Sequence, residues 1–253
     1  MQTASLATVA AYCNRLLRIA RFQDWPGAAN GLQVENRGRV TRIAAAVDAT
    51  VATLRRAVDA RADLLIVHHG LFWTAAHPWT GPRYEQIRLL LAGNLAVYSA
   101  HLPLDAHPKL GNNAGLCRAL GFRQLSPFFF QREAWLGFRT RTRVERGELV
   151  GRLDRVFNGP LRLLPGGPAV CRRIGVVSGG AGGDLQLAAR EGLDTFITGE
   201  GPHWTYAAAE EAGVNVLYGG HYATETFGVK ALAAHLSERY GLPWAFIDHP
   251  TGL

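Results

Sequence analysis

The chain lacks any long hydrophobic run. No stretch of its 253 residues approaches the roughly 20 consecutive apolar residues that a membrane-spanning helix needs. The N-terminus has neither a basic start nor a hydrophobic region of the length that a signal peptide requires. Hydrophobic residues make up 48% and charged residues 19%, as is usual for a soluble α/β protein. We therefore expect a cytoplasmic protein with no membrane partner.

Cysteine is also scarce. Cys13, Cys117 and Cys171 are odd in number, widely spaced and set among apolar residues. This pattern favours buried thiols in a reducing compartment over disulfides.

Lysine is nearly absent, so arginine supplies almost all of the positive charge behind a formal net charge of +7. A basic chain favours anionic partners such as nucleotides or nucleic acid. The arginines are scattered, however, apart from the local run at 139, 141, 143 and 146, and a compositional bias of the source genome explains them equally well. Nucleic acid is therefore a weakly supported partner, and a small anionic substrate is the better expectation.

Two motifs of other enzyme classes are missing. No His-Glu-x-x-His sequence is present, which disfavours a metalloprotease. The glycine-rich segment at 178–183 could cradle a phosphate with backbone N–H groups, but it lacks the Lys-Ser/Thr of a Walker loop. We interpret it as a plain turn.

Apolar runs and helical patterns alternate along most of the chain. Strands are expected at 42–47, 64–67, 95–99, 125–130, 135–142, 174–177, 195–198, 214–218 and 244–247. Helices are expected at 84–92, 111–120, 144–157, 185–190 and 223–240, and two more end near residues 60 and 212. Asparagine after Gly111 is a credible N-cap for the helix that starts there. The alternation predicts an α/β fold of two similar lobes with sheets flanked by helices. Residues 1–125 would form the first lobe with its N-terminal helix, and 126–253 a crossing region (near 122–170) and the second lobe.

Five potential metal ligands fall in three short segments, each where an expected strand ends. They are His68, His69, Asp105, His221 and Glu225. Imidazoles mixed with carboxylates suit divalent zinc, iron or manganese. A site at the ends of strands, in the cleft between the lobes, would bring them together. The sequence thus predicts a metal protein with two ions per subunit.

Each segment also has an ordinary explanation. The adjacent His68 and His69 could be structural, Asp105 follows a proline and could cap a helix, and His221 with Glu225 could mark a solvated helix face. Their joint placement at strand ends carries the prediction. A carboxylate can bridge two ions, so Glu225 is assigned as the bridge. We expect His68 and Asp105 on one metal, and His69 and His221 on the other.

Six motifs occur in order along the chain. They are Asn-Gly-Leu-Gln-Val at 30–34, Val-His-His-Gly at 67–70, His-Leu-Pro-Leu-Asp-Ala-His-Pro-Lys-Leu-Gly-Asn-Asn at 101–113, Thr-Gly-Glu at 198–200, Gly-His-Tyr-Ala-Thr-Glu at 220–225 and Phe-Ile-Asp at 246–248. Together they resemble the NIF-three-like dinuclear-metal hexameric family, whose bacterial members are often labelled GTP cyclohydrolase I type 2 homologues. The resemblance runs from end to end and implies two α/β lobes, a toroidal homo-hexamer and a dinuclear site in each subunit, with all five ligands carried over. Gly-Pro-His-Trp at 201–204 departs from the family pattern, so no role is assigned to His203.

Other residues near these segments could take part in chemistry. His101 is the candidate catalytic residue, as a general acid/base or as a group that orients the site, although a hydrogen-bonded loop histidine is an equal alternative. Glu200 could contact substrate or solvent at the metals, but an acid at a helix N-terminus explains it slightly better. Trp73, His77 and Trp79 could stack a base or form a packed loop.

Two functions follow from these patterns. The first is a metal-dependent hydrolase of cyclohydrolase or phosphohydrolase type that acts on a nucleotide or another anionic small molecule. The alternative is a non-catalytic metal-binding hexameric ring with a regulatory, metal-handling or nucleic-acid-associated role. The family label alone does not fix the chemistry.

Overall fold

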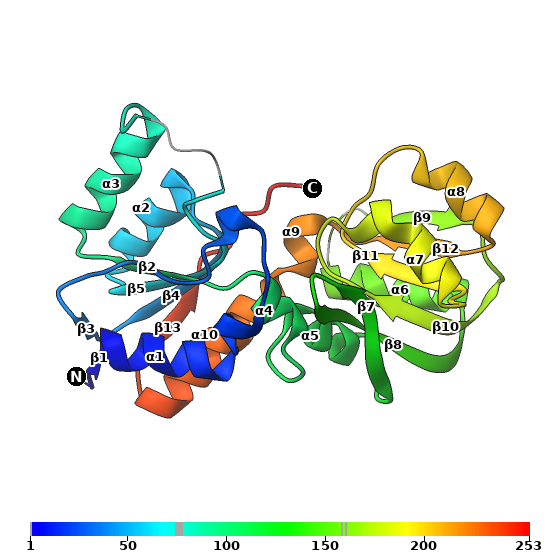
Figure 1. Ribbon diagram of the computed structural model, residues 1–253, viewed down its shortest axis with the longest axis horizontal. Coiled ribbons are helices and arrows are strands. Elements are labelled where there is room, and N and C mark those ends of the chain that lie inside the picture. Colours follow the sequence, from blue (N-terminus) through cyan, green and yellow to red (C-terminus); the bar gives the residue numbers. More distant parts are fainter. Residues whose placement is uncertain (1, 74–77, 158, 160) are drawn as a thin grey trace. The chain divides into compact units, whose positions relative to one another are not determined.

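The computed structural model describes residues 2–73, 78–157, 159 and 161–253. The chain forms two compact α/β units (Figure 1). The first unit comprises the residues up to Leu104 together with Gly228–His249, and the second comprises Asp105–Phe227 and Pro250–Leu253. Each contains a sheet flanked by helices, which confirms the predicted fold class. No helix in the described ranges is long and apolar enough to cross a membrane.

The first unit contains a five-stranded sheet in the order β13-β4-β5-β6-β2. Its strands are β2 (Gly31–Val34), β4 (Ile43–Asp48), β5 (Leu64–His69), β6 (Ala96–Ser99) and β13 (Trp244–Phe246). Strands β13, β4, β5 and β6 are parallel, and β2 joins β6 in the antiparallel sense. A separate two-stranded ladder joins β1 (Ala4–Ser5) to β3 (Arg39–Val40). The parallel arrangement places the carboxyl ends of β4, β5 and β6 at one edge of the sheet.

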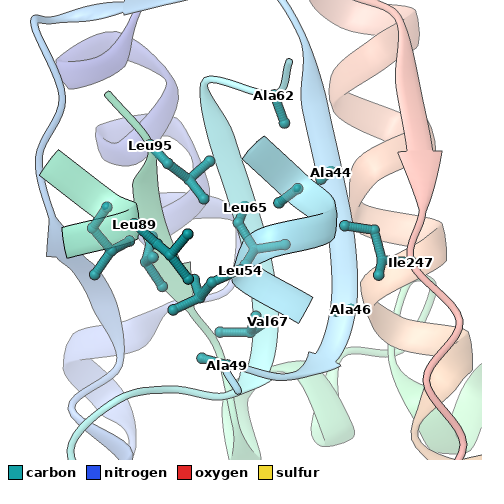
Figure 2. Packing of buried hydrophobic residues seen from close by; sticks show 13 residues of the cluster. Ala44, Ala46, Ala49, Leu54, Ala62, Leu65, Val67, Leu89, Leu95 and Ile247 are labelled. Atoms are coloured by element: carbon teal, nitrogen blue, oxygen red, sulfur yellow. The ribbon is translucent and has the colours of Figure 1, made fainter. Parts of the chain in front are cut away.

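The sheet of the first unit is covered by helices on both faces (Figure 1). Its helical elements are α1 (Leu6–Leu16), η1 (Ile19–Arg21), η2 (Pro26–Ala28), α2 (Val51–Asp59), α3 (Pro82–Ala92), α4 (Leu102–Ala106) and α10 (Thr226–Tyr240), of which α4 and α10 carry the chain between the units. Figure 2 shows Leu54 of α2 and Leu89 of α3 packed against Leu65 and Val67 of β5. These side chains are almost completely buried. Aliphatic residues on β5 therefore anchor the strand that ends in the histidine pair.

The second unit contains a six-stranded sheet in the order β7-β8-β10-β11-β12-β9. Its strands are β7 (Leu125–Gln131), β8 (Ala134–Glu145), β9 (Arg162–Pro165), β10 (Val170–Val176), β11 (Thr195–Thr198) and β12 (Asn215–Tyr218). The three central strands β10, β11 and β12 are parallel, while β7, β8 and β9 are antiparallel to their neighbours. The ends of the parallel strands again share one edge.

Helices cover the second sheet as well. They are α5 (Asn112–Ala119), α6 (Arg146–Phe157), η3 (Ala181–Asp184), α7 (Leu185–Arg190), α8 (Thr205–Ala212) and α9 (His221–Thr224). Leu116 of α5 and Leu149 of α6 pack with Ile174 and Val176 of β10 in one buried cluster. Because side chains alternate along a strand, Gly175 faces the opposite side, where Leu193 approaches it closely. The core of this unit is therefore built on both faces of β10.

Some features differ from the sequence-based expectations. Residues predicted to cross between lobes form β7, β8, α6 and β9, which are part of the second sheet or pack on it. The final strand β13 pairs with β4, so the chain returns to the first unit near its end. The predicted division into 1–125 and 126–253 does not include this return. The helix predicted at 223–240 is two helices, α9 and α10, separated at Glu225.

Candidate metal centre

His68 and His69 end strand β5, as the sequence predicts. His68 is fully buried, and its Nδ1 lies 2.9 Å from the carbonyl oxygen of Ala100. Because a carbonyl oxygen can only accept a hydrogen bond, Nδ1 of His68 carries the proton. In the neutral ring, Nε2 then carries the lone pair that can bind a metal.

His69 is oriented by a carboxylate on the neighbouring strand. Asp48 ends β4 and stands directly opposite His69 in the parallel register. Its Oδ1 lies 2.8 Å from His69 Nδ1, so in the neutral ring Nδ1 donates and Nε2 carries the lone pair. A carboxylate in this position fixes the ring and raises the basicity of a ligating histidine. Sequence patterns put Asp48 at a strand end but gave no sign of this role.

His101 belongs to a third group of the same kind. Its Nδ1 lies 2.8 Å from Oδ1 of Asp24, whose other oxygen accepts hydrogen bonds from Leu102 N at 2.9 Å and Asn30 Nδ2 at 2.8 Å. Asn30 Oδ1 in turn accepts from His101 N at 2.7 Å. Burial raises the pKa of Asp24, but the hydrogen bond and charge of His101 and the other donors outweigh it and lower the pKa overall. Asp24 therefore stays ionised and holds His101 in one orientation.

These three histidines form one cluster within the first unit. One ring nitrogen of each lies within 4.8 Å of those of the others. Trp73 closes one side, with its ring 5.7 Å from the His69 ring and 4.8 Å from the His101 ring, edge to face in both cases. Trp73 is thus part of the site, whereas Trp79 lines a separate small apolar cavity with Leu71 and Phe72. His77, the third member of the predicted cluster, lies outside the described residues.

The motif at 30–34 also supports the loop that follows the histidine pair. Gln33 Oε1 accepts a hydrogen bond from Leu71 N at 2.7 Å, and Gln33 Nε2 donates to the carbonyl oxygen of Ala28 at 3.0 Å. The motif at 30–34 thus holds two loops beside the histidines.

Asp105 is nearly buried in the second unit, where two donors bind one of its oxygens. Asn112 Nδ2 and Ser178 Oγ each lie 2.8 Å from Asp105 Oδ1. Asn113 Oδ1 accepts from Ser178 N at 2.6 Å, which fastens the loop after β10 to helix α5. The expectation that an asparagine caps this helix is wrong, because the N-cap residue is Gly111, which has no side chain to cap it. Both asparagines instead turn inward and position Asp105.

His221 and Glu225 meet in the second unit at the turn after β12. His221 Nε2 lies 3.1 Å from Oε1 of Glu225, which is buried, and His221 Nδ1 lies 2.8 Å from Oε1 of Glu200. The pair is not on one continuous helix, because α9 ends before Glu225. Glu200 follows β11 and precedes α8 by several residues, so the helix-terminus explanation for it is wrong. His203 lies exposed just before α8.

Two carboxylates set the protonation of His221. Burial lowers the pKa of its imidazole, but the hydrogen bonds and negative charges of Glu225 and Glu200 outweigh burial and raise the pKa to about 9. With no cation present, His221 is therefore an imidazolium between two carboxylates at neutral pH. This strongly anionic surrounding also favours a divalent cation in place of the proton.

The glycine-rich segment 178–183 turns at 179–180 and continues into η3, which begins at Ala181. Gly179 has a φ of 70° and a carbonyl oxygen that accepts from Gly199 N at 2.9 Å and Glu200 N at 3.1 Å. A Cβ on Gly179 would collide with Oε1 of Glu225. Glycine is needed here because the turn passes directly against the Glu225 carboxylate.

A family model described as Duf34/NIF3 (NGG1p interacting factor 3) matches residues 4–251. The chain belongs to the DUF34/NIF3 family. The resemblance found from the six motifs is confirmed.

Known relatives cover the DUF34/NIF3 chain almost completely. A protein of Deinococcus radiodurans named GTP cyclohydrolase 1 type 2 homolog is 42% identical over 239 residues, which are 94% of this chain and 90% of the relative. A protein of the same name from Halobacterium salinarum is 42% identical over 247 residues, covering 95% of this chain and 96% of the relative. The crystal structure of TTHA1606 from Thermus thermophilus aligns with a TM-score of 0.92 at 40% identity, over 99% of this chain and 100% of that one.

The side chains of this DUF34/NIF3 chain fit divalent cations. In the first unit, fixed acceptors hold Nδ1 of three histidines, so that each ring offers Nε2. In the second unit, His221 lies against Glu225 and Asp105 is held by Asn112 and Ser178, and imidazole and carboxylate groups of these kinds suit zinc, iron and manganese. Each unit therefore carries side chains whose chemistry suits a divalent cation.

Proposed function

We propose that this protein binds two divalent metal ions through five residues and uses them in a hydrolase that acts on a nucleotide or another anionic small molecule. The five ligands are His68, His69, Asp105, His221 and Glu225. The name of the relatives, GTP cyclohydrolase 1 type 2 homolog, supports a ring-opening hydrolysis, and phosphoester hydrolysis is the second version of the proposal.

The observation that carries the proposal is the fixed orientation of the imidazoles. A structural histidine needs only one satisfied ring nitrogen and a packed ring. Here Ala100 O and Asp48 hold the Nδ1 of the two proposed ligands His68 and His69, and one ring nitrogen of each lies within 4.8 Å of the other and of a ring nitrogen of His101, the proposed base. Such convergence of basic nitrogens is expected of a metal site, where an outer acceptor fixes each ligand.

Divalent cations held there would supply Lewis acidity, which acidifies water and polarises a carbonyl, ring carbon or phosphoryl group. Beside them, His101 is proposed as the general base. Asp24 fixes the proton of His101 on Nδ1, so Nε2 can accept a proton and the carboxylate can stabilise the imidazolium that forms. The net charge of +7 favours an anionic substrate.

We further propose a homo-hexamer, on the strength of the family resemblance. Six copies of the 27.5 kDa chain would have a mass of about 165 kDa. Light scattering coupled to size-exclusion chromatography measures this mass directly, and a monomer or dimer under native conditions contradicts the hexamer.

The metal proposal is tested by elemental analysis of protein purified without added metal. The wild type should carry close to two ions per chain, and Glu225→Gln should carry one or none, because the bridging carboxylate is lost. Glu210→Gln removes the same charge from an exposed position on α8 and should keep two ions. Equal metal content in all three proteins would contradict the ligand assignment.

The hydrolase proposal is tested by screening nucleotides and phosphoesters with the metal-loaded wild type and His101→Ala. As a general base, His101 contributes about 10²–10⁴-fold to the rate, so the variant should keep its metal and lose that factor. Loss of metal from His101→Ala would overturn the base assignment and make His101 a ligand. If the fully loaded wild type turns over no substrate, the non-catalytic metal-binding ring replaces the hydrolase.

A further inference from the structure

A second group of charged residues lies on the sheet of the second unit, apart from the metal donors. A cavity of about 400 Å³ is lined by Arg139, Arg141, Arg173 and Glu191, together with Leu125 and Leu193. The arginines come from two adjacent strands, β8 and β10, and alternation along β8 puts Arg139 and Arg141 on one face. Two arginines of the run at 139, 141, 143 and 146 therefore line a defined pocket.

Two of these arginines repel each other across the sheet. Arg141 and Arg173 stand directly opposite in the antiparallel pairing of β8 with β10. Like charges in directly opposite positions destabilise a sheet, whereas opposite charges there stabilise it. The pairing of Arg141 with Arg173 therefore lowers the stability of the sheet without a structural need for it.

The neighbouring acidic groups offset this cost only in part. Glu191 pairs with Arg139 at 2.9 Å. Asp194 accepts hydrogen bonds from the backbone N–H groups of Arg172 and Arg173, and its contact with Arg173 Nε, at 3.8 Å, is longer than a hydrogen bond. Among the described residues, Arg141 has no ion-pair partner. The pocket is therefore short of negative charge.

The pocket and the metal donors lie at opposite edges of this sheet. Glu200 and His221 follow the carboxyl ends of β11 and β12, as Ser178 follows that of β10. Glu191 and Leu193 instead precede the amino end of β11. A molecule in the pocket would not reach the donors of the second unit, so the pocket is distinct from the proposed hydrolytic site.

We propose that this pocket binds a small phosphorylated molecule. Guanidinium groups match the geometry of phosphate oxygens and can bind them through two hydrogen bonds each. A volume of about 400 Å³ lies within the usual range of small-molecule sites. Leu125 and Leu193 provide apolar surface for the remainder of the ligand, whose phosphate balances the charges of Arg141 and Arg173.

Calorimetric titration of the full-length, metal-containing protein with inorganic tripolyphosphate tests the proposal. Arg141→Gln and Arg173→Gln should each weaken binding by about tenfold or more, as expected when a charge-assisted hydrogen bond is lost. Arg155→Gln removes the same charge from an exposed position of α6 and should leave the affinity within about twofold, since it lies outside the pocket. A loss of affinity with rising salt is also expected.

Thermal unfolding separates a binding role from a structural one. Without tripolyphosphate, Arg141→Gln should unfold at the wild-type temperature or above it, because a repulsion is removed. With tripolyphosphate, the stabilisation seen for the wild type should be lost in the variant. Unchanged affinity in both pocket variants would overturn the proposal, since the anion would then bind elsewhere. Tighter binding of a single-stranded oligothymidylate than of tripolyphosphate, lost in the same variants, would also overturn it in favour of a nucleic acid.

Discussion

At the residue scale, the proposed site depends on acceptors that fix each imidazole. Asp48 acts through His69, which it contacts at 2.8 Å from the end of the adjacent parallel strand. Such carboxylates typically contribute about 10–100-fold to metal affinity. In the second unit the roles are reversed, because Ser178 and Asn112 donate hydrogen bonds to the Asp105 carboxylate and hold it in place.

Removing the Asp48 carboxylate should therefore weaken metal binding. We expect Asp48→Ala to lower the affinity by about 10–100-fold, because His69 loses both its orientation and part of its basicity. Competition with a chromogenic chelator measures the change. Asp59→Ala, an exposed acid at the end of α2, serves as the control and should bind like the wild type. Equal affinity of the two variants would show that Asp48 does not position a ligand.

Gly179 offers a second test at this scale. Gly179→Ala places a side chain at a φ of 70° and against Glu225, so we expect a loss of about 1–3 kcal/mol in stability together with lowered metal content. Gly183→Ala lies in the same turn with open space around it and should change neither quantity. The measurements are chemical unfolding and elemental analysis. A Gly179→Ala protein with full metal content would argue against Glu225 as a ligand.

The sequence predicts candidate metal donors but not the residues that hold them. His68, His69, His221 and Glu225 follow apolar runs, and their types and positions indicate metal binding without any structure. Asp24 and Asp48 gave no such signal, because each acts through a contact formed only when strands or loops far apart in the sequence come together. For the contact between Asp48 and His69, the one available indication was that both residues end neighbouring strands, because parallel strands that start together also end together.

At the element scale, strand β5 links the core to the histidine pair. Its apolar residues are buried against α2 and α3, and its last two residues are imidazoles. Buried strands such as β4, β5, β11 and β12 were predictable because they are continuous apolar runs. The edge strands β2 and β9 were not, since they are short and one ends in a proline.

Truncation of a core residue in β5 should destabilise the first unit. Leu65→Ala removes a fully buried side chain, and we expect a loss of about 2–5 kcal/mol in the free energy of unfolding. Leu91→Ala, on the exposed side of α3 at 73% exposure, should change it by less than about 0.5 kcal/mol. Denaturant titration followed by circular dichroism measures both. Similar effects of the two substitutions would contradict the described packing.

At the scale of the whole molecule, the chain leaves the first unit in α4 and returns to it in α10. Sequence patterns identified two α/β regions but not this return, because strand order depends on pairing between distant segments. Strand β13 pairs with β4, which lies near the other end of the sequence.

The reactivity of the three cysteine thiols tests the burial of side chains in both units. Burial raises the pKa of Cys13 and Cys117 to about 12 and also raises the pKa of Cys171, so little thiolate forms at about pH 8. We expect native protein to react slowly with a disulfide reagent and denatured protein to release three equivalents of thiol at once. Rapid reaction of any cysteine in the native state would contradict its burial, and fewer than three equivalents after denaturation would reveal a disulfide.

The central claim is that five side chains hold two divalent ions. Anomalous diffraction from a crystal of the as-purified protein, recorded at the absorption edge of the metal found in it, tests this claim most directly. We expect two peaks per chain, about 3.5–4 Å apart. Each should lie about 2.0–2.2 Å from its nitrogen and oxygen ligands, with Glu225 bound to both. A single peak, or peaks away from His68, His69, Asp105, His221 and Glu225, would contradict it.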